Sequence, residues 1–119
     1  MKKRIMIADD SRSIVKAVKK VLETEGFEVI TAYSGEDCLT KLKKEKPDLI
    51  LLDILMSLSG VEVLKSIMKL NPKANVIMLT VMGEEPVIKE CRRLGAKDFI
   101  TKPFDNKELV QRVKQALGE

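Results

Sequence analysis

The chain has 119 residues, the usual size of one domain, and we expect a single domain over residues 1–119. Hydrophobic residues make up 45% of the sequence and charged residues 34%, which suits a buried core under a hydrated surface. No apolar run approaches the roughly 20 residues that cross a bilayer, and the apolar stretch near the N-terminus ends at Asp9 and Asp10. We therefore expect no signal peptide, no membrane contact and a cytoplasmic location.

The net charge is +4 and the isoelectric point about 9.1, values that are typical of many nucleic-acid-binding domains. However, the lysines are spread over several predicted helices, and aromatic residues make up only 3%, with no Trp to stack on bases. We therefore expect a hydrated lysine-rich surface and no direct nucleic-acid contact. The sequence has no His, the usual general base of serine and cysteine hydrolases. Cys38 and Cys91 lack zinc-ligand spacing and are expected to be reduced, packed side chains.

The first half of the chain alternates short apolar runs with amphipathic stretches. Ile5 to Ala8 is typical of a buried strand that ends at the two aspartates. Ser11 suits the N-cap of a helix that runs to about Glu25, where Gly26 ends it. Phe27 to Ala32 predicts a second strand, and Ser34-Gly35 begins a second helix that carries Cys38, Leu39 and Leu42.

The second half repeats this pattern. Pro47 precedes the most hydrophobic run of the sequence, Leu49 to Leu52, which predicts a third strand. A third helix begins at Gly60 and ends near Asn71-Pro72. The remaining elements are a strand over Val76–Leu79, a helix from Glu84-Glu85-Pro86 to Leu94, a strand over Lys97–Thr101 and a last helix capped by Asp105.

Five such strand–helix units define the fold class. Continuously apolar strands joined by helices indicate a parallel sheet covered on both faces, and right-handed crossovers restrict its topology. We therefore predict an α/β, doubly wound, flavodoxin-like (βα)5 fold with a five-stranded parallel sheet in the order 2-1-3-4-5. In such a sheet, ligands bind beyond the carboxyl ends of the strands, near the switch point between strands 1 and 3.

Polar side chains stand at the carboxyl ends of four predicted strands, and the fold brings them to one edge. They are Asp9, Asp10, Asp53, Thr80 and Lys102. One pair of close carboxylates costs on the order of 4 kcal/mol at an effective dielectric near 20, and one lysine offsets only part of this repulsion. A hard divalent cation supplies the rest, and Mg²⁺ favours one or two carboxylates plus water and a phosphate oxygen, with Mn²⁺ as an alternative. An aspartate ionised at neutral pH needs no general base to attack a phosphoryl group.

This arrangement resembles the signature of receiver domains of bacterial and archaeal response regulators, of the type found in chemotaxis regulators. The similarity covers about Arg4 to Leu117 and includes Asp9-Asp10, Asp53, Thr80 and Lys102-Pro103 in their order along the chain. The resemblance implies that the domain is a signalling switch rather than an enzyme with an external substrate. It implies a sensor histidine kinase as phosphodonor and a target protein or output domain as the receiver of the signal. It also allows a phosphorylation-dependent dimer.

The resemblance further assigns a role to each site residue. Asp53 is the phosphoacceptor, and Asp10, Asp53 and the Leu55 backbone carbonyl bind Mg²⁺, with Asp9 acting largely through water. Lys102, whose bond to Pro103 is often cis in the family, pairs with the phosphoryl oxygens. Thr80 turns its hydroxyl to the phosphoryl group and Phe99 swings inward. These movements switch the face formed by the fourth helix, fifth strand and fifth helix.

The segment after Asp53 departs from the family pattern Asp-x-x-Met-Pro-x-x-x-Gly. Ser57 replaces the proline, and Gly60 comes one residue early, which leaves the path of this loop open. Val81 stands where the family has a small residue and is expected to narrow access to Asp53. Leu55 and Met82 flank the acyl phosphate in the family, and because neither orients an attacking water, we expect a long-lived phosphorylated state.

Three other functions share parts of the pattern. A flavodoxin-type electron carrier needs a phosphate-binding first loop, whereas this loop begins with two anions, Asp9 and Asp10. A haloacid-dehalogenase-like phosphatase needs a second aspartate two residues after the nucleophile, where Leu55 stands. The more serious alternative is a degenerate receiver domain that acts as a phosphorylation-independent docking module, which the altered loop favours and the intact Asp53, Thr80 and Lys102 oppose.

Overall fold

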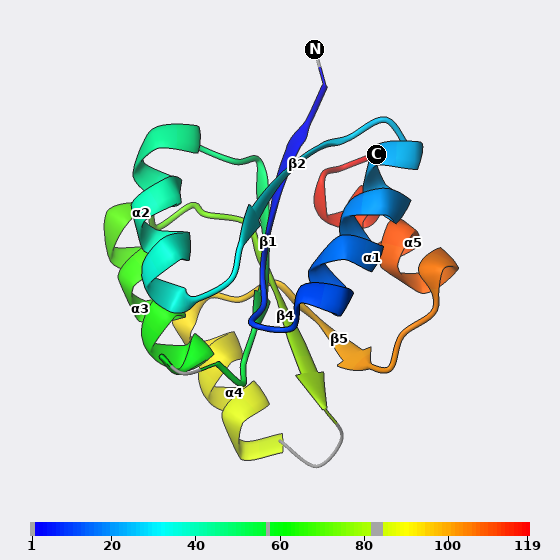
Figure 1. Ribbon diagram of the computed structural model, residues 1–119. Helices are drawn as coiled ribbons and strands as arrows, with labels where there is room; N and C mark the ends of the chain where they lie inside the picture. Colours follow the sequence, from blue (N-terminus) through cyan, green and yellow to red (C-terminus); the bar gives the residue numbers. More distant parts are fainter. Residues whose placement is uncertain (1, 57, 82–84) are drawn as a thin grey trace.

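Ten elements alternate along the chain in a computed structural model that describes residues 2–56, 58–81 and 85–119 (Figure 1). The strands are β1 (Arg4–Ala8), β2 (Glu28–Ala32), β3 (Leu49–Asp53), β4 (Val76–Val81) and β5 (Asp98–Lys102). The helices are α1 (Arg12–Thr24), α2 (Gly35–Glu45), α3 (Gly60–Leu70), α4 (Glu85–Leu94) and α5 (Asn106–Ala116).

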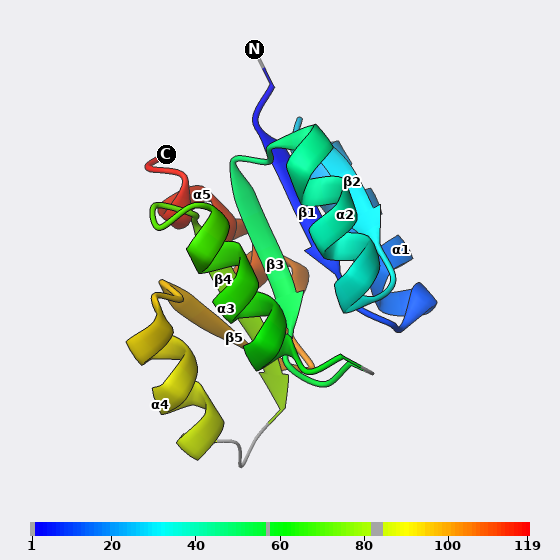
Figure 2. The same ribbon diagram turned by 90° about the vertical axis from the view of Figure 1, so that its left-hand side faces the viewer.

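The strands form one parallel sheet in the order β2-β1-β3-β4-β5. Helices α2, α3 and α4 cover one face of the sheet, and α1 and α5 cover the other (Figures 1 and 2). This is the predicted doubly wound fold with its predicted strand order, which is thereby confirmed. β2 lies on one side of β1, and β3 and the later strands lie on the other side. β1 and β3 are therefore parallel neighbours, and their carboxyl ends lie side by side.

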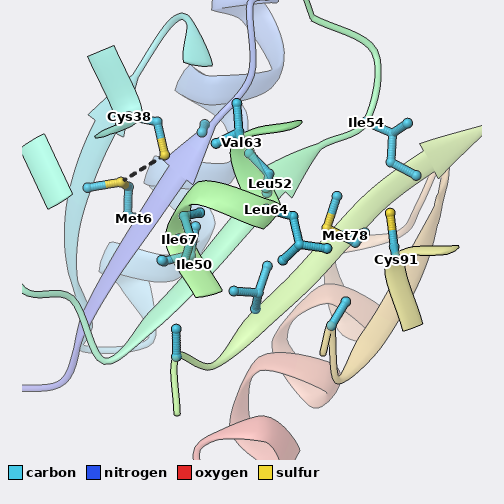
Figure 3. Close-up of a cluster of buried hydrophobic side chains, with 14 of the residues drawn as sticks. Met6, Cys38, Ile50, Leu52, Ile54, Val63, Leu64, Ile67, Met78 and Cys91 are labelled. Carbon is cyan, nitrogen blue, oxygen red and sulfur yellow. Dashed lines mark hydrogen bonds between the residues drawn. The ribbon is translucent and has the colours of Figure 1, made fainter. Parts of the chain in front are cut away.

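The core has two parts, because strand side chains alternate between the two faces of the sheet. On β1, Met6 and Ala8 join the cluster under α2, α3 and α4, whereas Ile5 and Ile7 join the cluster under α1 and α5. Figure 3 shows the first cluster, in which the Cys38 thiol donates to the Met6 sulfur at 3.7 Å. Burial on both faces explains why β3 is apolar along its length until Asp53.

The predicted helix caps lie where the sequence puts them. The Ser11 hydroxyl accepts a hydrogen bond from the Ile14 amide, and the Asp105 carboxylate accepts one from the Glu108 amide at 2.7 Å. Gly26 has a φ of 92°, a left-handed conformation that favours glycine and ends the turn after α1. These local signals fix where each helix meets the sheet.

Each predicted strand differs from the observed one by one or two residues at its ends, and two of these differences have a clear cause. Phe27 lies outside β2 because its amide donates to the Leu22 carbonyl in the turn that ends α1. Lys102 is the last residue of β5 rather than the first residue after it, because it pairs with Val81 of β4. In both cases backbone pairing sets the boundary, and apolar periodicity carries no information about it.

Neither Cys38 nor Cys91 forms a disulfide, and both are fully buried. Burial raises the pKa of the Cys38 thiol to about 12, which keeps it uncharged and unreactive at neutral pH. Across the described residues, none of the helices combines the length and apolar character needed to span a bilayer.

Candidate functional site

The sheet brings the five predicted polar residues to the carboxyl edge of its strands. Asp9 and Asp10 follow β1, and Asp53 is the last residue of β3, its neighbour in the sheet. Thr80 lies near the end of β4, and Lys102 ends β5. The strands in Figure 2 point toward this edge. The loops that follow β1, β3, β4 and β5 therefore all begin at this end of the molecule.

Three carboxylates form a compact cluster at this edge. Asp9, Asp10 and Asp53 each offer an oxygen, and these oxygens all lie within 4.8 Å of one another. Asp9 is fully buried and Asp53 is 4% exposed, whereas Asp10 is exposed. The cluster thus combines two carboxylates held away from solvent with one at the surface.

Lys102 connects the two buried carboxylates. Its Nζ lies 2.7 Å from Asp9 Oδ2 and 3.2 Å from Asp53 Oδ1. The backbone amide of Ser11 donates to Asp9 Oδ1 at 2.9 Å, and that of Leu55 donates to Asp53 Oδ1 at 3.2 Å. Asp9 is therefore held through both oxygens, whereas Asp53 is held through Oδ1 alone in these contacts.

The electrostatics of the cluster show an excess of negative charge. Burial and the neighbouring Asp9 raise the pKa of Asp53 from 3.8 to about 6, although Lys102 and the Leu55 amide lower it. Burial acts to lower the pKa of Lys102, but its hydrogen bond to Asp9 and the charge of Asp53 raise it above the ordinary value. One ammonium thus faces three carboxylates, and its charge does not fully stabilise an ionised Asp53.

This donor set fits a hard divalent cation. All three side chains offer carboxylate oxygens, the ligands that Mg²⁺ prefers, and they already lie close enough to share one ion. A bound cation would also lower the raised pKa of Asp53, because a nearby positive charge favours the ionised form. Leu55, whose carbonyl is the fourth predicted ligand, follows Asp53 by two residues and has a side chain that is 59% exposed.

Glycine is required where α3 returns to the site. The Gly60 amide donates to the Ile54 carbonyl at 2.9 Å, and a Cβ at Gly60 would lie only 2.2 Å from the backbone oxygen of Asp53. The shortened loop thus closes by packing the start of α3 directly on the backbone of the predicted phosphoacceptor. Ser57, Met82 and Glu84, which the sequence analysis singled out, lie outside the described residues.

The two predicted switch residues lie on β4 and β5. Thr80 is 2% exposed, and its hydroxyl donates to the Val81 carbonyl at 3.1 Å. Phe99 is half-buried, and the guanidinium of Arg92 on α4 lies 4.7 Å from the centre of its ring. Arg92 could not be identified from the sequence, because its contact depends on how α4 packs against β5 and no local motif indicates that packing.

The Lys102–Pro103 peptide bond is cis, as the resemblance implies. On the other side of the site, Arg12 stacks on the Tyr33 ring with its guanidinium 4.3 Å from the ring centre. This second cation–π pair was also missed from the sequence, because Arg12 begins α1 and Tyr33, 21 residues later, follows β2.

A flavodoxin-like sheet with three clustered carboxylates and a lysine at its carboxyl edge is typical of a class of signalling switches, and comparison with known families places this chain within it. The family profile of the response regulator receiver domain matches residues 5–114. The chain therefore belongs to the response regulator receiver family, whose members are the switches of two-component signalling and act with histidine kinases and output domains.

Individual relatives fall into two kinds. The chain is 42% identical over 118 residues to the alkaline phosphatase synthesis transcriptional regulatory protein PhoP of Bacillus subtilis, covering 98% of this chain and 49% of that protein. It is 36% identical over 113 residues to the chemotaxis protein CheY of Thermotoga maritima, covering 93% and 94% of the two. The chain thus spans about half the length of the PhoP relative and nearly all of the CheY relative.

Solved structures agree with this assignment. A receiver domain protein of the CheY type from Methanospirillum hungatei superposes with a TM-score of 0.95 at 33% identity, covering 99% of this chain and 95% of that one. The receiver domain of NtrX from Brucella abortus gives a TM-score of 0.91 at 32% identity, covering 96% and 98%. Both similarities extend over the whole sheet and its helices.

Proposed function

We propose that this domain, over residues 1–119, accepts a phosphoryl group on Asp53 from the phosphohistidine of a sensor kinase in a Mg²⁺-dependent reaction. One observation carries the proposal: a single lysine, Lys102, contacts both buried carboxylates of a cluster of three acidic side chains. Such a cluster has the charge and the oxygen donors for phosphoryl transfer, and the family of the chain supplies the signalling context.

Asp53 acts as the nucleophile. Its Oδ2, which makes neither of the contacts of Oδ1, attacks phosphorus as the phosphorus–nitrogen bond of the donor breaks, and the bonding pair leaves with the imidazole. Asp10, Asp53 and the Leu55 carbonyl, with Asp9 through water, would hold Mg²⁺, which would supply the positive charge that offsets the carboxylates and the phosphoryl oxygens. Lys102 then shifts from Asp53 to a phosphoryl oxygen while Asp9 keeps its amine in place.

The switch follows from the same contacts. Thr80 rotates its hydroxyl from the Val81 carbonyl to the phosphoryl group, and the space it leaves admits the ring of Phe99. Because Arg92 stacks on that ring, an inward movement of Phe99 breaks or relocates a contact of α4. Phosphorylation therefore shifts the equilibrium between two arrangements of the face formed by α4, β5 and α5, which a target protein, an output domain or a second copy of the domain reads.

Mass spectrometry of the intact protein tests the central step. Incubation with acetyl phosphate or phosphoramidate plus Mg²⁺ adds one phosphate to the wild type, and this gain disappears in Asp53→Asn or with a chelator. Asp48→Asn is the matched control, because it removes a carboxylate next to the opposite end of the same strand and retains the gain. Loss of the gain in both variants, or its persistence in Asp53→Asn, contradicts the proposal.

A phosphorylation-independent docking module is the second candidate, and the shortened connection between β3 and α3 favours it. In that case neither phosphodonor adds mass, while Mg²⁺ binding to the acidic cluster still raises thermal stability. The mass measurement and a thermal scan on the same samples therefore distinguish the two functions.

A further inference from the structure

A cavity lies at the end of the molecule opposite the acidic cluster. It has a volume of about 420 Å³ and lies between the C-terminal ends of α2 and α3, where β3 begins. These helix ends and the start of β3 are at the same end of the molecule in Figure 2. The volume is within the range of small-molecule sites in proteins.

The floor of this cavity is apolar. Ile50 of β3 and Ile67 of α3 are buried beneath it, and Leu42 of α2 is half-buried at its side. Leu70 stands at the rim with 54% of its surface exposed, and among the described large hydrophobic side chains only Leu55 is more exposed. Apolar walls with an exposed leucine at the entrance favour a ligand that has an apolar body.

Charged residues around the cavity set the sign of its ligand. Lys43 and Lys46 at the end of α2 and Lys73 after α3 all line it. Asp48 is the one acidic residue in the lining, and its carboxylate accepts a hydrogen bond from the Arg4 backbone amide at 2.8 Å. Three cations against one engaged carboxylate favour an anionic group on the ligand.

A buried acceptor without a partner adds a second requirement. The Asn75 side chain, which lines the cavity, donates through Nδ2 to the Ala116 carbonyl at the end of α5 at 2.8 Å. Its Oδ1 is buried and has no hydrogen-bond partner among the described residues. Because an unsatisfied buried acceptor is costly, a ligand N–H or O–H gains a favourable contact when a small shift of the cavity wall exposes this oxygen to it.

We propose that this cavity binds a small amphipathic anion with an apolar body, one acidic group and a hydrogen-bond donor. The apolar body packs on Ile50, Ile67 and Leu70, and the lysines pair with the acidic group. The donor satisfies Asn75, which joins the site to the end of α5. This site is separate from Asp53 and does not depend on phosphorylation.

Titration with 1-anilinonaphthalene-8-sulfonate tests the proposal, because this probe has fused rings, a sulfonate and an N–H. We expect saturable fluorescence enhancement with one molecule per chain. Lys43→Gln combined with Lys73→Gln weakens binding about fivefold, since each exposed ion pair contributes modestly. The matched control, Lys16→Gln with Lys19→Gln, removes two exposed lysines of α1 outside the cavity and leaves the affinity unchanged.

Amide shifts in two-dimensional NMR locate the bound probe. We expect the largest changes over residues 42–50 and 70–75, and equal binding in Asp53→Asn, so that failure of the phosphorylation proposal does not affect this one. The uncharged analogue N-phenyl-1-naphthylamine binds more weakly. Equal binding of the two probes, equal affinity in both lysine pairs, or shift changes centred elsewhere overturns the proposal.

Discussion

Asp53→Asn is expected to stabilise the metal-free protein at neutral pH, although it removes the predicted phosphoacceptor. The folded protein holds Asp53 in a buried position beside Asp9, which raises its pKa from 3.8 to about 6. Ionised Asp53 therefore opposes folding whenever no cation is bound. Asparagine is uncharged and retains an acceptor for the Leu55 amide and for Lys102, so the substitution removes the repulsion and retains the packing.

The magnitude follows from linkage. A shift of about two pKa units corresponds to about 3 kcal/mol, since each unit is about 1.4 kcal/mol. Because the folded-state pKa is raised, the contribution of Asp53 to stability is fully present below pH 3.8 and is lost as the pH rises through about 6. We expect Asp53→Asn to exceed the wild type by about 1–3 kcal/mol at pH values above this window, and the two to converge in acid.

Urea unfolding in the presence of a chelator, at a series of pH values from mildly acidic to neutral, measures this difference. The quantity of interest is the free energy of unfolding of Asp53→Asn minus that of the wild type, because titration of the groups that do not interact with Asp53 cancels in it. Glu23→Gln is the control, since it removes an exposed carboxylate of α1 and should give a difference near zero at every pH.

Two results would refute the reasoning. One is a variant that is less stable than the wild type throughout, and the other is a difference that stays constant across the pH window. Added Mg²⁺ provides a further check, because a ligand that binds the folded state stabilises it in proportion to the logarithm of its concentration above Kd. The wild type should gain more stability from Mg²⁺ than Asp53→Asn. The difference between their free energies of unfolding should therefore shrink or change sign.

Three further perturbations address individual contacts. Leu55→Asn should shorten the life of the phosphorylated protein, measured as the loss of the added mass with time in Mg²⁺; loss within seconds in the wild type contradicts the predicted long lifetime. Lys102→Ala should prevent phosphorylation. In urea unfolding with a chelator present, it should also lower the free energy of unfolding by about 1–3 kcal/mol, because it leaves the buried Asp9 without its ammonium partner. Gly60→Ala should cost about 1–3 kcal/mol in urea unfolding, since the new methyl group would lie against the Asp53 backbone oxygen; a change below the fitting error would mean that the loop relaxes freely.

The sheet order was predictable because two independent patterns agree. The continuous apolar run of β3 requires burial on both faces, and the amphipathic stretch between each pair of strands requires a crossover helix. Together they leave only doubly wound parallel sheets, and five strands suit the observed order. Caps such as Ser11 and Asp105 were equally visible, because they depend on residues within three positions of one another.

The candidate site was predictable for a related reason. Parallel strands all end at one edge, so Asp9, Asp53 and Lys102 had to meet once their places at strand ends were recognised. The sequence did not reveal that Lys102 contacts Asp9 more closely than Asp53, because this depends on side-chain geometry. The cytoplasmic location and the individual catalytic roles stay predictions from sequence.

Long-range contacts were outside the reach of the sequence. Arg92 and Phe99 stack only because α4 packs beside β5, and Asn75 reaches the Ala116 carbonyl only because the start of β4 lies next to the end of α5. The spacing of residues along the chain does not predict which side chains of a helix and a strand come into contact. The lysine-rimmed cavity was missed likewise, since its lysines resemble ordinary surface lysines until the helices are assembled.

The altered loop after β3 is the feature that most favours a degenerate domain, and its geometry weakens that argument. The Gly60 amide binds the Ile54 carbonyl, so the missing residue is absorbed in the connection between these two positions. Asp53 retains its contacts with Lys102 and the Leu55 amide on the strand side of this connection. A docking module would have no need to keep three repelling carboxylates within 4.8 Å, because their repulsion opposes folding unless a cation is bound. The retained cluster therefore supports the proposal that Asp53 accepts a phosphoryl group.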